Sequence, residues 1–414
     1  MARVLVLTLI FSPDNVSTAQ LVSSLALDLK SYGHDVRVIT TTPHYHRDLS
    51  LEARQPLQKC WGPLLKKSEL NGIPVYHIRM PNKHCARWLR ILSWLFFHGF
   101  STLVGLFIRF KPDVIFVPSP PLSMGLNAYV LGGLLGAKYI YNVQELYPDI
   151  AVNLGLIRSP RIIGMLSATE RFIYNHAAAV TTITDSIDTK VRQRTQKPST
   201  VHQIPNFVDL DEVITIDRDN AFSRQYELQS CFVITYAGNL GVPQNLMLLV
   251  EAAEVLKEKK TIKFMIIGDG SEKERLRRAI IEKGLSNIVV VDYQPLSLMP
   301  SIYAASDLFY VGQQLEAHAD GIPSKIYRIF GNGKPILAVT DANSDLAACV
   351  TKAQGGVVVT SNDPKVLAGV VASLSETTDK VREYGVNGYR YAQQFSRQQI
   401  SQAYDRLIRS LITS

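Results

Sequence analysis

Residues Lys263–Val291 read KFMIIGDGSEKERLRRAIIEKGLSNIVVV and contain a complete strand–helix–strand unit. An apolar run, Lys263–Ile267, ends in a glycine-containing turn, and a helix is expected over Glu272–Lys283 because Gly284 follows it as a helix stop. The β-branched run Ile288–Val291 predicts the next buried strand. Strands that alternate with helices in this way form parallel sheets, so this stretch predicts an α/β fold.

The same alternation continues through nearly the whole chain of 414 residues, a length that predicts two or three domains. The polar passage Asp209–Ser223, which follows Pro205–Phe207, divides the pattern, so we predict two doubly wound α/β domains in tandem. A long irregular stretch is expected before Asn71. Strands are expected at Val4–Leu9, Asp35–Thr41, Val75–Ile78, Val114–Val117, Lys138–Val143 and Ala179–Ile183 in the first domain, and at Phe232–Ala237, Lys263–Ile267, Ile288–Val291, Leu308–Val311, Ile336–Val339 and Val357–Val359 in the second.

The composition combines few charges with a positive excess: 19% of residues are charged and the net charge is +8. A positive excess indicates an anionic partner, which could be nucleic acid, a phosphorylated small molecule or an anionic membrane. Nucleic acid is the least favoured, because the basic residues neither form a stripe nor alternate with exposed aromatic residues. The four cysteines form no CxxC pair, which argues against a disulfide scaffold and a thiolate metal site.

One stretch, Trp88–Phe110, raises the question of a membrane span, because Ile91–Ile108 contains 18 residues without formal charge. Small or polar residues recur in it at the spacing of an amphipathic helix, and the segments on either side both look like parts of one sheet. The sequence therefore favours either a peripheral helix attracted to anionic lipid or an ordinary helix packed on the sheet over a true span. The recurring residues are Arg90, Ser93, His98, Ser101, Gly105 and Arg109, and the flanking positive charges are Lys83, Arg87, Arg90, Arg109 and Lys111.

Two glycine-containing loops follow strands of the second domain, where open parallel sheets bind ligands. In Ala237–Gly241, Gly238 and Gly241 would let a ligand approach the backbone closely, and the next helix would offer free N–H groups to a phosphate. In the second loop, Gly268-Asp269-Gly270, the aspartate could accept hydrogen bonds from a ribose or a donor sugar. The alternative for the second loop is a tight turn in which Ser271 caps the following helix.

A third loop, Asp320–Lys325, carries the strongest signal for a site. Ser324 could cap the short helix expected over Lys325–Gly331, whose N-terminus attracts anions, and Lys325 adds a full positive charge. This arrangement predicts a phosphate cradle without a P-loop, in which Asp320 could bind a polyol. A capping role alone is the alternative.

The first domain offers a candidate cleft in Asn142–Asp149, where Glu145 and Asp149 follow a predicted strand with an aromatic residue between them. His44 and His46 could suggest a metal pair, but without a third close ligand we expect an ordinary loop. The first strand–helix loop lacks G-x-G-x-x-G, which argues against a dinucleotide cofactor.

These motifs together resemble the GT-B glycosyltransferases of the large retaining family 4, over nearly the full length of the chain. The resemblance is to the branch that makes bacterial surface polysaccharides, which includes the fucosyltransferase of colanic acid synthesis and O-antigen N-acetylfucosamine transferases. It rests on FSPDNVSTA, YGHDVRVIT and KPDVIFV in the first half, on PNFVDLDEV at the crossover, and on YAGNLGVPQN, IIGDG and ASDLF in the second; the ELYPD stretch and the DGIPSKIYRIFGNGKPIL block point to the same branch.

The sequence departs from this family at three kinds of position. The Glu-x7-Glu signature appears as Asp320 and Arg328, so the first carboxylate is kept and the second is replaced by a positive charge. The phosphate-binding Arg and Lys appear as Asn239 and Gln244, which shifts the cationic role towards Lys325. The histidine often found in the first domain corresponds to Gln144, so the resemblance assigns orientation of the acceptor or donor sugar to Glu145 or Asp149.

The resemblance implies transfer of a sugar from a UDP- or GDP-sugar to an acceptor on undecaprenyl diphosphate, with the anomeric configuration retained and without a metal ion. It implies synthesis of O-antigen, capsule or exopolysaccharide by a cytoplasmic protein that lies peripherally on the inner face of the membrane. The implied donor-binding residues are Gly238, Asn239, Gly241, Gln244, Gly268, Asp269, Gly270, Pro323, Ser324 and Arg328; the catalytic residues are Glu145, Asp149, Asp320 and Lys325; and the acceptor-binding residues are Asp14, Asn15, Ser17 and Gln144.

The resemblance also implies two Rossmann-like domains around a deep cleft, with the C-terminal helix Arg397–Thr413 crossing back to the first domain. We therefore expect an acceptor-binding domain over 1–207 plus 386–414 and a nucleotide-sugar-binding domain over 208–385. Two alternatives stay open: a nucleotide-sugar 2-epimerase of the same fold, and a membrane-attached GT-B protein that has lost activity.

Overall fold

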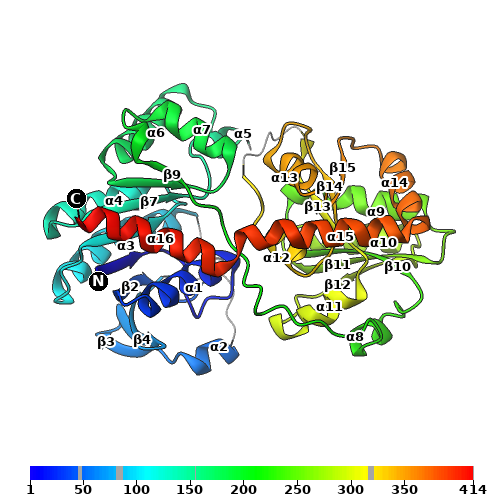
Figure 1. Ribbon diagram of the computed structural model, residues 1–414, viewed down its shortest axis with the longest axis horizontal. Coiled ribbons are helices and arrows are strands. Elements are labelled where there is room, and N and C mark those ends of the chain that lie inside the picture. Colours follow the sequence, from blue (N-terminus) through cyan, green and yellow to red (C-terminus); the bar gives the residue numbers. More distant parts are fainter. Residues whose placement is uncertain (45–48, 81–86, 154, 316–320, 414) are drawn as a thin grey trace. The chain divides into compact units, whose positions relative to one another are not determined.

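The apolar runs of the sequence form two sheets, one in each of two compact units of the computed structural model (Figure 1). The structure describes residues 1–44, 49–80, 87–153, 155–315 and 321–413. Unit 1 comprises Met1–Asn206 and Gln398–Ser414, and unit 2 comprises Phe207–Arg397. The return to the first unit was expected at residue 386, whereas the structure places it at Gln398.

The later return has a physical cause in the packing of α15 (Thr378–Ala392), which belongs to unit 2. Tyr391 packs edge-on against Phe330, with the ring centroids 6.3 Å apart, and Phe395 packs on Tyr327 at 4.8 Å. The segment before Gln398 is therefore held by the core of the second unit.

Unit 1 is built on a nine-stranded sheet in the order β3-β4-β5-β2-β1-β6-β7-β8-β9. The strands from β5 to β9 are parallel, and the central ones are buried on both faces, which explains their unbroken apolar runs. The strands are β1 (Arg3–Leu7), β2 (Asp35–Thr41), β3 (Gln58–Trp61), β4 (Leu65–Leu70), β5 (Ile73–Ile78), β6 (Val114–Pro118), β7 (Lys138–Val143), β8 (Ala179–Thr182) and β9 (Val201–Gln203).

The expectation of an irregular stretch before Asn71 is wrong, because β4 pairs antiparallel with β5 and β3 pairs antiparallel with β4, which extends the sheet by two strands. All four residues of β3 are exposed, so this edge strand has no apolar pattern to reveal it. The helices of unit 1 are α1 (Ser17–Ser31), α2 (Leu49–Arg54), α3 (Arg87–Phe107), α4 (Ser123–Leu135), α5 (Asp149–Asn153), α6 (Pro160–His176), α7 (Asp185–Arg194) and α16 (Arg397–Thr413).

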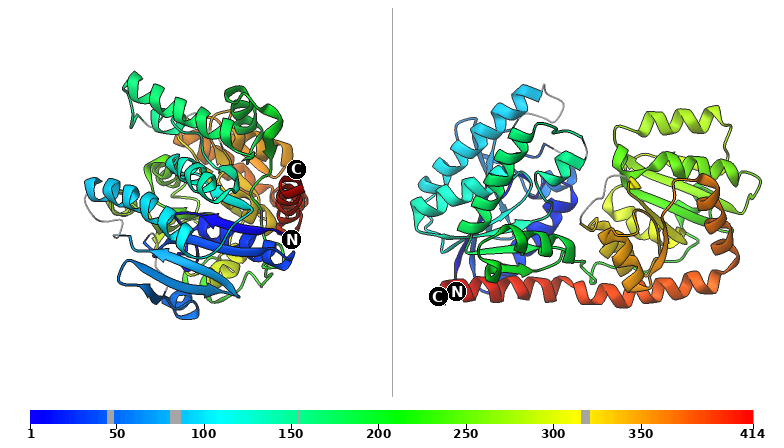
Figure 2. Two further views of the ribbon diagram at one scale, coloured as in Figure 1. Left: turned by 90° about the vertical axis from the view of Figure 1, so that its left-hand side faces the viewer. Right: turned by 90° about the horizontal axis from the view of Figure 1, so that it is seen from above.

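Helix α3, the apolar stretch of the sequence, lies beside α4 (Figure 2), and its polar residues His98, Ser101 and Thr102 face that helix. His98 Nε2 lies 2.8 Å from Ser123 Oγ, Thr102 Oγ1 donates to Asn127 Oδ1 at 2.8 Å, and Asn127 Nδ2 donates to Ser101 Oγ at 2.7 Å. Phe97 and Val104 are fully buried on the sheet side, whereas other apolar side chains of α3 face solvent. Within the described residues, no helix combines the length and the apolar character that a membrane crossing needs.

Helix α16 covers the opposite face of the same sheet (Figure 2). Tyr404 packs edge-on against Phe116 of β6 with ring centroids 5.4 Å apart. Polar contacts fix its rotation: Asp405 lies 2.7 Å from His34 Nε2, and Ser401 Oγ donates to Asp28 at 2.6 Å. These contacts account for the apolar stripe of this helix and complete the first unit.

Unit 2 is a six-stranded, wholly parallel sheet in the order β12-β11-β10-β13-β14-β15, with buried apolar clusters on both faces. Its strands are β10 (Phe232–Asn239), β11 (Ile262–Asp269), β12 (Ile288–Val291), β13 (Leu308–Gly312), β14 (Ile336–Val339) and β15 (Gly356–Val359). Besides α15, its helices are α8 (Ala221–Gln225), α9 (Leu246–Val255), α10 (Lys273–Glu282), α11 (Met299–Ala305), α12 (Lys325–Gly331), α13 (Asp345–Ala353) and α14 (Pro364–Glu376). Because β10 is central, the loops after β10, β11 and β13 lie at one edge of the sheet.

Candidate active site

Gly238 near the end of β10 and Gly268 near the end of β11 are paired in the register of the sheet. A Cβ on Gly268 would lie 1.8 Å from the carbonyl oxygen of Gly238, and both residues have φ near +150°. Leu240 ties the two loops together, because its N–H donates to Asp269 O and its carbonyl accepts from the N–H of Glu272, each at 2.9 Å. Neither glycine can therefore carry a side chain, and the loop edge consists of closely packed backbone.

Lys325, the first residue of α12, brings its ammonium group to this backbone edge. Its Nζ lies 4.0 Å from the centroid of the Tyr236 ring, and a Cβ at Gly238 would be 3.8 Å from the same nitrogen. Burial lowers the pKa of Lys325 to about 7. Among the described residues, no carboxylate forms an ion pair with this amine, so its charge is available to an anion.

Two buried tyrosines that the sequence reasoning did not single out hold the loop after β10. The hydroxyl of Tyr236 donates to Asn239 O at 2.6 Å, and the hydroxyl of Tyr310 on β13 donates to Asn245 O at 2.9 Å. Burial raises the pKa of both hydroxyls, so both remain protonated donors. Tyrosines at the ends of neighbouring buried strands, next to a polar loop, were the signal available in the sequence.

The loop after β10 closes on itself through Gln244. The N–H of Gly241 donates to Gln244 Oε1 at 3.1 Å, and Gln314 N–H, in the loop after β13, donates to Pro243 O at 3.1 Å. The side chain of Gln244 therefore shapes the loop, and Asn239 lies exposed at its edge.

The loop before α12 is described from Gly321 onward, so the predicted role of Asp320 falls outside the described residues. The prediction that the Ser324 side chain caps α12 is wrong: Ser324 occupies the N-cap position without a side-chain capping bond, and the first turn is closed by Ile326 N–H donating to Pro323 O at 2.9 Å. Gly321 N–H donates to Asp345 at 2.7 Å, which holds the loop to the start of α13.

Arg328 and Asp269 differ in how far they reach solvent. Arg328 is half-buried, and its charge opposes the burial that raises the pKa of Tyr303 to about 12. Asp269 is exposed, with Lys273 Nζ 3.4 Å from its carboxylate, and so remains accessible to hydroxyl groups. The alternative in which Ser271 caps α10 is wrong, because α10 begins at Lys273 with Glu272 in the N-cap position.

In unit 1, Glu145 stands out at the end of β7. It is half-buried, and burial raises the pKa of its carboxyl group. No hydrogen-bond or ion-pair partner of this carboxylate is found in the part of the chain that the structure describes. A half-buried carboxyl group with a raised pKa and no protein partner is typical of a catalytic or substrate-orienting acid.

Asp149 has a different environment, because its carboxylate accepts from Arg194 Nη2. The same guanidinium donates to both carboxylate oxygens of Glu170, at 3.1 and 3.0 Å, and Glu170 also accepts from the Tyr174 hydroxyl at 2.8 Å. Burial raises the pKa of Glu170, and Arg194 and Tyr174 oppose that rise. Asp149 is thus part of an ion-pair cluster, and its catalytic role stays a prediction that the geometry favours less than that of Glu145.

Replacing Arg194 with alanine is expected to lower the free energy of unfolding by about 2–3 kcal/mol, because it leaves the Glu170 carboxylate buried without its cation. Urea unfolding would measure the loss. Adding Glu170→Gln to the same variant should recover most of it, since no charge is then left buried. A double variant as unstable as the single one would contradict the assigned pairing.

Gln144 is fixed by amides on neighbouring segments. Its Nε2 donates to Asn142 Oδ1 at 2.6 Å, its Oε1 accepts from Asn206 Nδ2 at 2.8 Å, and its backbone N–H donates to Ser119 Oγ at 3.0 Å. Asn142 reaches Thr181 Oγ1 at 3.0 Å in turn. Gln144 is therefore part of a polar network that orders the ends of β7 and β8.

The predicted acceptor-binding residues of the loop after β1 lie largely inside the unit. Asp14 and Asn15 are buried, with Asp14 accepting from His44 N–H at 3.1 Å and Asn15 Oδ1 accepting from Gln20 Nε2 at 2.9 Å. Ser17 begins α1, directly after Val16 in the N-cap position. These residues shape the loop, and their role in acceptor binding stays a prediction. His46 of the considered metal pair lies outside the described residues.

A chain of hydrogen bonds that the sequence did not predict links the loop after β1, through Ser12, to the interior of unit 1. Ser12 Oγ donates to Gln55 Oε1 at 2.6 Å, Gln55 Nε2 donates to Ser68 Oγ at 2.9 Å, and Ser68 Oγ contacts His77 Nε2 at 2.7 Å. Because His77 Nδ1 faces the carbonyl of Thr41 at 3.1 Å, it must carry the proton and Nε2 must accept. Burial lowers the pKa of His77 to about 4, so the ring stays neutral near pH 7.

Comparison with known proteins gives a consistent result for both units. Residues 17–206 match the model of the "Glycosyl transferase 4-like domain", and residues 218–391 match that of "Glycosyl transferases group 1". The chain is 25% identical over 383 residues to the putative colanic acid biosynthesis glycosyl transferase WcaI of Escherichia coli, covering 90% of this chain and 91% of WcaI. It is 24% identical to the probable glycosyltransferase WbjE of Pseudomonas aeruginosa over 64% of this chain and 67% of WbjE.

Solved structures share the fold at lower identity. HepE of Anabaena in complex with UDP superposes with a TM-score of 0.72 at 16% identity, covering 99% of this chain and 100% of HepE. Sucrose-phosphate synthase of Thermosynechococcus elongatus gives a TM-score of 0.76 at 14% identity, covering 99% of each chain.

Proposed function

Because the chain is a glycosyltransferase of the GT-B fold, with a 4-like first domain and a group 1 second domain, we propose that it transfers a sugar from a nucleoside diphosphate sugar during synthesis of a bacterial surface polysaccharide. The name of WcaI, a putative colanic acid biosynthesis glycosyl transferase, supports the pathway class. The complexes of HepE with UDP and with UDP-glucose support a nucleoside diphosphate sugar as donor. The observation that carries the proposal is the ammonium of Lys325 beside the closely packed glycine loops, where no carboxylate of the described residues forms an ion pair with it.

The chemistry that this arrangement serves is departure of a diphosphate. When the bond between the sugar's anomeric carbon and the diphosphate oxygen breaks, negative charge grows on that oxygen, and fixed positive groups and N–H donors lower the barrier. Lys325 supplies the charge, and Gly238 carries no side chain that would keep a phosphate oxygen from the backbone beside the amine. Donor contacts are proposed for the exposed Asn239 and Asp269, and Arg328 is proposed to act near the nucleotide.

We propose that the configuration is retained by attack from the face that the diphosphate leaves. An acceptor hydroxyl oxygen bonds to the anomeric carbon, the diphosphate departs, and the acceptor's proton passes to a phosphate oxygen of the leaving group. Glu145 orients the acceptor. With Lys325 in the cationic role, the reaction is expected to proceed in the presence of a chelator.

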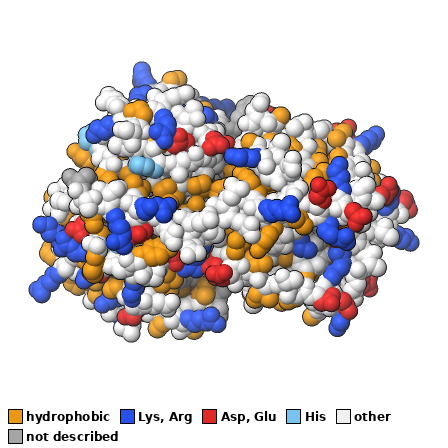
Figure 3. All heavy atoms as spheres, viewed as in Figure 1, with side chains coloured by type: hydrophobic (Ala, Val, Ile, Leu, Met, Phe, Trp, Pro, Cys, Tyr) orange, Lys and Arg blue, Asp and Glu red, His pale blue; other side chains and the backbone are white. Residues whose placement is uncertain are grey.

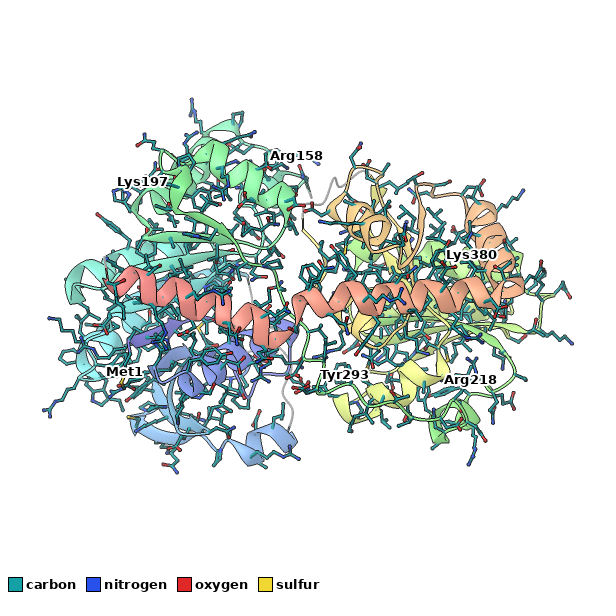
Figure 4. The ribbon with its side chains drawn as sticks, viewed as in Figure 1. Met1, Arg158, Lys197, Arg218, Tyr293 and Lys380 are labelled. Carbon is teal, nitrogen blue, oxygen red and sulfur yellow. The ribbon has the colours of Figure 1, made fainter. Side chains whose placement is uncertain are left out.

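The acceptor is proposed to be lipid-linked, and the surface of unit 1 supports this. Helix α3 turns its polar stripe towards α4, so its exposed side is apolar, and it is continued by exposed apolar residues of neighbouring elements. Exposed Lys and Arg lie along the same segments, among them Arg158, labelled in Figure 4. Lys and Arg are not gathered in one stripe on the face that Figure 3 shows. The apolar surface comprises Trp61, Leu64, Trp94, Phe96, Leu103, Leu106, Phe107, Leu126, Tyr129, Val130, Leu134, Leu156, Ile162 and Met165.

An exposed apolar surface of this size, edged by positive charge, fits an anionic bilayer. Replacing Leu103 and Phe107, which are 47% and 64% exposed, with serine is expected to weaken binding to phosphatidylglycerol vesicles at least about tenfold. Vesicle sedimentation measures the binding, with Ile281→Ser on α10 as the control because that side chain is 78% exposed in unit 2. Equal binding by the wild type and the double variant would contradict the assignment.

The function is tested by incubating the purified protein with a panel of UDP- and GDP-sugars, with and without lipid-linked saccharide. Transfer of radiolabel to the lipid fraction is the expected result. Conversion of the donor sugar without acceptor would instead support the epimerase, and the absence of binding to every donor would support the inactive membrane-attached protein.

A further inference from the structure

We propose that Tyr236 is a positioning residue for the leaving diphosphate: its ring face holds the ammonium of Lys325, and its hydroxyl fixes the carbonyl of Asn239 in the loop beside it. The inference rests on the proposed donor-binding function and adds to it the residue that positions the ammonium of Lys325 and keeps it charged. Tyr236 lies on β10 and Lys325 on α12, so one side chain links two elements of unit 2.

The contact between the two side chains is close and sheltered. Nζ lies 4.0 Å from the ring centroid, well inside the range in which an aromatic face attracts a cation. The Tyr236 side chain is itself buried, and its ring packs edge-on against Tyr310 with centroids 6.4 Å apart. Tyr310 therefore holds the ring in place. The amine is close both to this ring and to the backbone at Gly238, which carries no side chain.

The ring has an electrostatic role because this amine has lost much of its hydration. Burial favours the neutral amine, as the pKa of about 7 shows. The negative face of the ring favours the charged form and opposes that effect. Without the ring, a larger fraction of Lys325 would be neutral near pH 7 and unable to attract a diphosphate.

Burial is the cause of the lowered pKa of Lys325, and within the described residues no charge–charge interaction adds to it. The other titratable or charged groups on the surrounding elements are Tyr236 on β10, Lys263 and Asp269 on β11, Tyr310 on β13, Tyr327 and Arg328 on α12, and Asp345, Cys349 and Lys352 on α13.

The hydroxyl of Tyr236 has a separate role that can be removed alone. It donates to Asn239 O at 2.6 Å, and Tyr236→Phe deletes this bond while keeping the ring over Lys325. Tyr236→Leu removes both. Phe309→Leu is the control, because it removes a buried ring from the neighbouring strand β13, and that ring packs on Tyr303 rather than on Tyr236.

The test measures the acetylation rate of Lys325 by acetic anhydride against pH, read by mass spectrometry on the full chain without donor. We expect a labelling midpoint near 7 for the wild type, Tyr236→Phe and Phe309→Leu, and a midpoint about one pH unit lower for Tyr236→Leu. Should Tyr236→Leu fail to fold, trifluorophenylalanine at position 236 keeps the shape and weakens the ring's negative face, so the midpoint should again fall. An unchanged midpoint in these ring-altered variants would overturn the proposal.

Donor binding forms the second arm of the test. Calorimetry with UDP- and GDP-sugars at pH 7.5 should show affinity about tenfold weaker for Tyr236→Leu than for Phe309→Leu, and the difference should shrink at pH 6, where the amine is again charged. If no nucleotide sugar binds the wild type, the proposed function fails, whereas the labelling result still decides the role of the ring.

Discussion

Replacing Lys325 with alanine is expected to lower kcat/KM for the nucleotide sugar about 10²–10³-fold while the protein stays folded. The amine is the cation beside the glycine loops of β10 and β11, and no carboxylate of the described chain neutralises it. The lost charge would otherwise oppose the negative charge that grows on the leaving diphosphate. Steady-state kinetics across pH 5–9 measure the effect.

The pH dependence gives the prediction a second readout. With a pKa of about 7, Lys325 is charged below pH 7 and loses its proton above it, so wild-type kcat/KM should fall as the pH rises through about 7. The alanine variant should lack this decline. Lys352→Ala, which removes an exposed positive charge from α13, is the control and should keep both the rate and the profile. Wild-type activity in Lys325→Ala would exclude the assigned role.

Removing the charge of Lys325 should lower the rate but should not lower the stability of the protein. The folded state lowers the pKa of Lys325 below that of an unfolded lysine, so between about pH 7 and the ordinary lysine value the folded state binds fewer protons. Its contribution to stability therefore rises with pH through that window and is unfavourable below it. Lys325→Met, which keeps most of the side-chain volume, should have an unchanged or higher thermal midpoint near pH 7. A marked loss of stability would indicate a structural lysine.

The sequence predicted six of the nine strands of the first sheet and all six of the second, because parallel strands that are buried on both faces appear as unbroken apolar runs. It did not predict β9, which has only three residues. Ile288–Val291 and Ile336–Val339 were placed at their observed bounds. The antiparallel edge formed by β3 and β4 was missed because β3 is exposed throughout and β4 is mostly polar, and their pairing depends on β5 rather than on a pattern of their own.

The sequence predicted a site residue only where the residue type alone indicates its role. Gly268 and Lys325 signalled a close backbone approach and a cation, and both lie at strand or helix ends as expected. The pairing of Lys325 with Tyr236, and of Asp149 with Arg194, could not be foreseen, because each pair meets only through tertiary packing. The same limit applies to α3: the sequence showed that its polar residues recur at helical spacing, but not that they face α4.

Replacing Glu145 with glutamine is expected to lower kcat at least about 10²-fold while leaving the protein as stable as the wild type or more stable. Burial raises the pKa of this carboxyl group, and no partner among the described residues stabilises its charge. The folded state therefore holds its proton more tightly than the unfolded state. The contribution of Glu145 to stability is therefore present below its unfolded-state pKa and is lost as the pH rises through its folded-state pKa.

At neutral pH the ionised Glu145 thus costs stability, and an amide of the same shape removes that cost. Activity should respond in the other direction, because the ionised carboxylate accepts a stronger hydrogen bond from the acceptor hydroxyl than a neutral amide or a protonated carboxyl group does; wild-type kcat should fall as the pH drops through the raised pKa. Asp149→Asn is the matched comparison: it breaks an ion pair with Arg194 whose side chains are both 26% exposed, so it should lower the free energy of unfolding by about 1 kcal/mol or less and affect kcat less than Glu145→Gln does. Thermal unfolding and kcat of both variants decide the matter, since a stability loss with retained kcat in Glu145→Gln would mark that carboxylate as structural.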